Sequence, residues 1–102
     1  MDGRVYVYQL AAFSESEKKT LRLISSYIYN NNTRCFNYRK LRAYWDKKRM
    51  WRVIEWHTVE RNIRRFAELG WLERQVSKKD RRKVMFCASD ELLALFRGLK
   101  WL

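Results

Sequence analysis

The clearest hydrophobic pattern in the chain lies between residues 56 and 69. Val59, Ile63 and Phe66 recur at the spacing of an α-helix and form one apolar stripe, while most other positions in the segment are polar or charged. Gly70 follows, at a point where a residue with positive φ commonly ends a helix. The pattern therefore predicts an amphipathic helix that ends just before this glycine.

Directly after the glycine the spacing changes to the alternation that is typical of strands. Segments 71–76 and 82–87 are predicted to pair as two strands, with residues 77–81 as the tip between them. Basic residues are concentrated at this tip. The sequence thus predicts a cationic β-hairpin immediately after the helix.

Two more helices are predicted upstream. Ser14 and Glu17 have the spacing of a capping box, and the helix that follows has Leu21 and Ile24 on its buried face. Asparagines at 30–32 favour a loop at its end.

Asn37 is the predicted N-cap of the next helix. For the interval 46–55 two alternatives stay open: this helix is extended, or the following one begins early, near Met50. Ser89 is predicted to cap the last helix, whose apolar residues are too numerous for one narrow stripe.

The first thirteen residues are harder to assign. Alternating β-branched and aromatic residues at 5–8 favour a short strand, although residues 9–13 suit the start of a helix equally well.

The order of these elements carries a resemblance. Residues 58–72 follow the pattern T-V-x-R-x-I-R-x-F-x-E-L-G-W-L, and with the basic hairpin this resembles the recognition helix and wing of the winged helix-turn-helix family. The resemblance covers about residues 14–100. It implies an α+β fold with a three-helix core, a small antiparallel sheet bearing the wing, and a C-terminal helix. The expected parts are an N-terminal arm (1–13), the winged helix-turn-helix domain (14–88) and a C-terminal helix (89–102).

The resemblance also concerns the two cysteines. In the family layout a short strand near residues 34–36 pairs with the second wing strand, which would bring Cys35 and Cys87 close together. Two buried, reduced side chains are the usual outcome inside a cell, and a disulfide is the alternative.

Charge strengthens the functional expectation. The net charge is +12, and residues 34–65 contain eleven basic and three acidic side chains, while residues 71–86 contain six and two. Charge gathered in two segments favours a polyanionic partner over a merely soluble surface.

The resemblance implies double-stranded DNA as this partner, bound by a transcriptional regulator, with the recognition helix in the major groove and the wing on phosphates or the minor groove. Arginine and asparagine can bond base edges there, whereas lysines and arginines elsewhere contact phosphates without reading sequence. Candidate contacts on the recognition helix are His57, Thr58, Arg61, Asn62, Arg64 and Arg65. On the wing they are Lys78, Lys79, Arg81, Arg82 and Lys83. A phosphate clamp is predicted from Arg39, Lys40, Arg42, Lys47, Lys48, Arg49 and Arg52.

The surplus apolar residues of the last helix favour a homodimer, with a monomer under a thick terminal cap as the alternative. Regulators of this small size are typical of viruses and plasmids, by resemblance. Without a secretory pattern or a long apolar segment, an intracellular, cytoplasmic location is expected, in the host cell if the protein is viral.

Other functions have less support. The sequence has one histidine and no nucleophile or phosphate-cradle motif, so no enzyme activity, cofactor or small-molecule ligand is expected. Cys35, Cys87 and His57 are one ligand short of a closed zinc site. Two alternatives stay open: a module for single-stranded DNA or RNA that stacks bases on Trp51, and a winged helix used as a protein-interaction adaptor.

Overall fold

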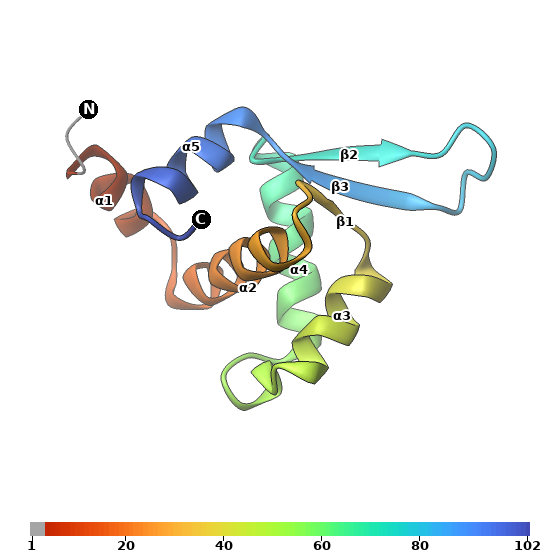
Figure 1. The fold of residues 1–102 in the computed structure, drawn as a ribbon, viewed down its shortest axis with the longest axis horizontal. Helices are drawn as coiled ribbons and strands as arrows, with labels where there is room; N and C mark the ends of the chain where they lie inside the picture. Colours follow the sequence, from red (N-terminus) through yellow and green to blue (C-terminus); the bar gives the residue numbers. More distant parts are fainter. Residues whose placement is uncertain (1–3) are drawn as a thin grey trace.

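The computed structural model describes residues 4–102, and Figure 1 shows a helical body from which a long hairpin projects. The elements in chain order are α1 (Arg4–Ala11), α2 (Glu15–Asn31), β1 (Cys35–Phe36), α3 (Tyr38–Lys47), the 3₁₀ helix η1 (Met50–Arg52), α4 (Trp56–Glu68), β2 (Leu72–Val76), β3 (Val84–Ala88) and α5 (Asp90–Gly98). The predicted α+β class, with three core helices, a small antiparallel sheet and a C-terminal helix, is confirmed.

The core forms where α2, α3 and α4 meet. Ile24 of α2, Leu41 of α3 and Ile63 of α4 are all 0% exposed. Burial of each such side chain stabilises the fold by roughly 1.5–3 kcal/mol. The predicted stripe on α4 is confirmed, since Val59 and Phe66 are also fully buried. One face of α4 is therefore fixed inside the domain.

The predicted N-caps and the predicted end of α4 are also confirmed, whereas α2 continues through Asn31, so that only Asn32 of the three asparagines lies beyond it. Ser14 and Glu17 make both bonds of the capping box: the Glu17 N–H donates to Ser14 Oγ at 3.2 Å, and the Ser14 N–H donates to Glu17 Oε1 at 2.8 Å. Asn37 and Ser89 cap α3 and α5. Gly70, with φ +84°, turns the chain from α4 toward β2.

The sheet has the order β1-β3-β2, and both pairings are antiparallel. The hairpin register runs from Leu72 opposite Ala88 to Val76 opposite Val84. The second wing strand begins at Val84, two residues later than predicted, so the tip is longer than the sequence suggested. Figure 1 shows β2 and β3 extending well beyond the helices.

Two local predictions are wrong. Residues 5–8 belong to the helix α1 and not to a strand. The interval 46–55 neither extends α3 nor starts α4 early, because α3 ends at Lys47 and a separate 3₁₀ turn precedes α4. In that turn Arg49 has φ +55°, a left-handed conformation that interrupts the helical path.

The cysteines form a disulfide between β1 and β3, so the expectation of two reduced side chains is wrong. Cys35 and Cys87 face each other across the strand pair, with Cα atoms 4.0 Å apart and a sequence separation of 52. The bond reinforces a strand pairing only two residues long. It connects the start of the helix-turn-helix to the base of the wing.

The N- and C-terminal helices cover the end of the domain opposite the wing (Figure 1). Phe13, just after α1, packs edge-on against Phe66 and Trp71, with ring centroids 5.8 and 5.6 Å away. On the C-terminal side, Trp101 stacks on Phe96 of α5. Most of the apolar surplus of α5 is thus used inside the domain.

We predict that the disulfide makes a large contribution to stability. A covalent link across 52 residues removes conformational entropy from the unfolded chain, worth typically about 2–4 kcal/mol. The variant Cys35→Ala/Cys87→Ala should lose about that free energy of unfolding in urea titrations. A reducing agent should destabilise the native sequence to a similar extent and leave the variant unchanged. Equal stability of the native chain with and without reductant would contradict the prediction.

Candidate nucleic-acid interface

The exposed side of α4 is opposite its buried stripe. His57, Arg61, Arg64 and Arg65 are exposed, and Thr58 is half-buried. Within the described part of the chain, no carboxylate lies at salt-bridge distance from the three arginines. Their guanidinium groups are therefore available to an external acceptor.

Asn62, the sixth candidate on this helix, points the other way. It is 5% exposed, and its side-chain amide donates to Thr20 Oγ1 of α2 at 3.0 Å. A buried polar group must be hydrogen-bonded, and this one is satisfied inside the protein. The prediction that Asn62 contacts DNA is wrong, because its amide fastens α4 to α2.

Position along α4 divides the remaining candidates. Thr58 and Arg65 lie one turn before and after Asn62, so they follow the edge of the helix nearest α2. Arg64 lies on the opposite edge, toward α3 and the sheet, where its positive charge lowers the pKa of the Tyr38 phenol. His57 and Arg61 lie between these edges. His57 Nε2 is 3.0 Å from a carboxylate oxygen of Glu55, so a ligand would compete with that contact.

A groove between α3 and α4 joins the two helices into one surface. It has a volume of about 640 Å³, and Arg39 and Arg42 of α3 line it together with Trp56 and Glu60 of α4. The guanidinium of Arg42 lies 5.9 Å from the centre of a Trp56 ring, a cation–π distance. Arg39 and Arg42 of the predicted clamp thus border the exposed face of α4.

Tyr38 extends this surface to the sheet. Its ring packs against Trp56 and against Phe86 of β3, with centroids 6.5 and 5.1 Å away. Burial raises the pKa of the Tyr38 phenol; Arg64 and Arg74 partly offset this rise, and Glu60 adds to it. The phenol therefore keeps its proton near neutral pH and can donate a hydrogen bond.

Sequence reasoning missed Tyr38, Glu60 and Arg74 as parts of this surface. Side chains two positions apart in a strand lie on the same face, so Arg74 shares a face of β2 with the buried Leu72. This alternation could have predicted that Arg74 faces the helices. Glu60 had a signal too, since it precedes Arg64 by four residues on one side of α4. A carboxylate there can accept a bond from the amino group of cytosine.

The wing tip owes its shape to two short side chains. Ser77 Oγ accepts from the backbone N–H groups of Lys79 and Asp80, and Asp80 Oδ1 accepts from the N–H of Arg82 at 3.0 Å. Arg82 Nε also lies 3.4 Å from Asp80 Oδ1. The other cations of the tip lie in the solvent and face no carboxylate at salt-bridge distance among the described residues: Lys78, Lys79, Arg81 and Lys83.

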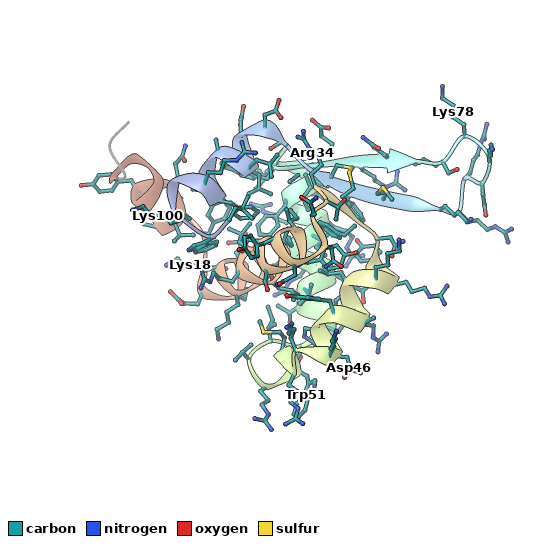
Figure 2. All side chains as sticks on the ribbon, in the orientation of Figure 1. Lys18, Arg34, Asp46, Trp51, Lys78 and Lys100 are labelled. Atoms are coloured by element: carbon teal, nitrogen blue, oxygen red, sulfur yellow. A yellow bond between two sulfur atoms is a disulfide. The ribbon has the colours of Figure 1, made fainter. Side chains whose placement is uncertain are left out.

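Lys40, also on α3, lies instead beside a separate pocket with Tyr27 and Phe36. The last residue of α3 and the turn that follows it carry the other four residues of the predicted clamp. Lys47, Lys48, Arg49 and Arg52 are all exposed there. Figure 2 shows this turn, marked by Trp51, and the wing, marked by Lys78, at two separate ends of the molecule. Basic side chains therefore extend from the turn, across α3 and α4, to the wing.

Comparison with known proteins agrees with this geometry. Residues 46–91 match the family described as a winged helix DNA-binding domain, and the matched segment includes η1, α4 and the whole wing. No curated protein sequence matches the chain. The match covers 46 of the 102 residues and agrees with the fold, so the resemblance to the winged helix-turn-helix family inferred from the sequence is confirmed.

Two further observations concern the same described residues. Residues 4–102 contain no helix with both the length and the apolar character needed to cross a bilayer. Nor do these residues bring together three or more histidine, cysteine or acidic side chains in a metal-binding cluster.

We predict that Asn62 supports stability and not DNA affinity. Asn62→Ala leaves the buried hydroxyl of Thr20 on α2 without this donor, which should cost about 1–3 kcal/mol of unfolding free energy. The neighbouring variant Arg61→Ala should unfold like the native chain and bind DNA more weakly. Thermal unfolding and fluorescence anisotropy, the latter well below the melting temperature, separate the two effects. An Asn62→Ala chain of native stability with reduced affinity would contradict this assignment.

Proposed function

We propose that this chain is a sequence-specific double-stranded DNA-binding protein that regulates transcription. In this proposal α4 enters the major groove, and the hairpin of β2 and β3 contacts phosphates or the adjacent minor groove. An α-helix fits the width of the major groove of B-DNA. The observation that carries the proposal is the arrangement of α4: one face is buried, and the other presents arginines that have no carboxylate at salt-bridge distance among the residues that the structure describes.

The proposal assigns different tasks to different parts of the surface. Arg61 and Arg64, on the exposed side of α4, are placed to bond guanine edges, and Glu60 is placed to accept from cytosine. The wing tip, the turn and the outer side of α3 hold phosphates and set the position of α4. Affinity then comes largely from counterion release, and specificity from α4.

We predict that α4 and the wing respond differently to mutation. A preferred duplex is first selected from a random pool. Arg61→Ala/Arg64→Ala should then reduce discrimination between this duplex and an unrelated one, because each bidentate hydrogen-bonded contact between a side chain and a base contributes about 1–3 kcal/mol to discrimination. Lys78→Ala/Lys79→Ala should weaken both duplexes alike and should reduce the salt slope of log K by about 0.9 for each phosphate that the wing no longer neutralises.

A matched control removes two charges elsewhere. Arg97→Ala/Lys100→Gly acts at the end of α5, and glycine at 100 respects its φ of +60°. Its affinity and salt slope should remain native, provided that light scattering gives this variant the mass of the native chain, because the end of α5 also belongs to the surface proposed below for a second copy. Unchanged discrimination in the α4 variant would show that this helix does not read bases, and failure of the native chain to bind any duplex would favour the adaptor alternative.

The proposal includes a homodimer. Most apolar side chains of α5 are buried inside the domain. We therefore place the second copy at the end formed by α1 and α5, where the side chain of Tyr8 is 75% exposed. An exposed aromatic side chain is a typical anchor at an interface.

We predict a mass of about twice 12.6 kDa in light scattering, and a palindromic selected site. Tyr8→Arg should lower the mass to that of one chain. The matched change Tyr29→Arg, at a residue of α2 that is 67% exposed, should leave the dimer intact. A native mass of one chain together with a site lacking symmetry would exclude the dimer and leave DNA binding standing.

A further inference from the structure

One tryptophan is placed differently from the other four. Trp56 is 8% exposed, and Trp45, Trp71 and Trp101 pack against the core, whereas Trp51 on η1 is 49% exposed and lies outside the core cluster. Figure 2 shows its side chain at the outer end of the α3–α4 turn. The exposed half of this indole does not contribute the stabilising free energy that the buried aromatic side chains of the chain provide.

The turn that presents Trp51 is anchored on both sides. The N–H groups of Val53 and Ile54 donate to the carbonyl of Met50 at 2.9 and 3.0 Å. Trp45 Nε1 donates to the carbonyl of Ile54, a residue only 6% exposed, at 2.9 Å. Met50 itself packs against the core. The indole is therefore held out by an ordered turn, and binding of a ligand would require little further ordering of the backbone.

The charge around this ring restricts the ligand. Four of the six residues 47–52 are basic, and the guanidinium carbon of Arg52 lies 5.3 Å from the centre of a Trp51 ring. An aromatic platform between cations matches a nucleotide, which joins a flat base to an anionic phosphate. A purely acidic protein segment would use the cations and leave the indole without a stacking partner.

Base pairing decides which nucleotide fits. Inside a duplex both faces of each base are covered by neighbouring bases, so an indole outside the groove meets only sugars and phosphates. An unpaired base offers a free face. The turn directly precedes the N-terminus of α4 at Trp56, so Trp51 lies beside that end of the proposed duplex site.

We propose that Trp51 stacks on an unpaired base beside the duplex held by α4 and the wing, with the cations of the turn on the adjoining phosphates. The chain then prefers DNA in which a duplex adjoins a single strand, or in which local pairing is open. This inference rests on the proposed duplex binding. It adds a second nucleic-acid site with its own ligand.

The test compares four DNAs in fluorescence anisotropy: the selected duplex with blunt ends, the same duplex with a single-stranded extension of about four nucleotides at either the 3′ or the 5′ end, and an extension lacking bases. The native chain should bind one of the two base-bearing extensions at least about fivefold more tightly than the blunt duplex. The abasic extension should give no gain. Trp51→Phe should keep the gain because phenylalanine also stacks.

Trp51→Ala should lose this gain and bind the blunt duplex like the native chain. Its thermal unfolding should be native, since the ring lies outside the core. A gain that survives in Trp51→Ala, a gain with the abasic extension, or no gain in the native chain would overturn the inference while blunt-duplex binding upholds the proposed function. If the native chain fails to bind the blunt duplex, the proposed function fails first and takes this inference with it.

Discussion

The burial of one face of α4 is the constraint on which the rest of the molecule depends. Val59, Ile63 and Phe66 are completely enclosed, and the hydrogen bond from Asn62 to α2 fixes rotation of the helix about its axis. Because side chains three or four residues apart share a side, this anchoring leaves Arg61 and Arg64 facing outward. The same packing that stabilises the domain thus determines which charges meet a ligand.

The position of the wing depends on a second, smaller set of contacts. Gly70 redirects the chain after α4, and the disulfide between Cys35 and Cys87 fastens β3 to the start of the helix-turn-helix. The backbone N–H of Ala88 also donates to the carbonyl of Arg34 at 2.8 Å. With its base held in this way, the hairpin extends beyond the core, where its cations are exposed to solvent and only Arg82 contacts a carboxylate, that of Asp80, among the described residues.

Much of this arrangement follows from local signals in the sequence. Capping residues such as Ser14 and Asn37, the stripe of α4 and the glycine after it each act over a few residues, so the pattern alone predicts them. Features that depend on contacts between segments distant in the sequence were harder to predict. Asn62 appears polar and exposed until α2 is known to lie against it, and Tyr38 joins the surface only because α3, α4 and β3 converge on its ring. At residues 5–8, strand-forming residue types occur in a helix, which shows how weak such preferences are in a short segment.

The disulfide has a topological consequence. Every cation proposed to contact DNA, from Arg39 to Lys83, lies between Cys35 and Cys87, so the whole candidate interface is contained in one covalently closed ring of backbone. A single cut by a protease at the protruding hairpin or the α3–α4 turn would leave the two fragments joined through sulfur. The domain would then retain its surface as a nicked but undivided molecule, and only cleavage combined with reduction would release the pieces.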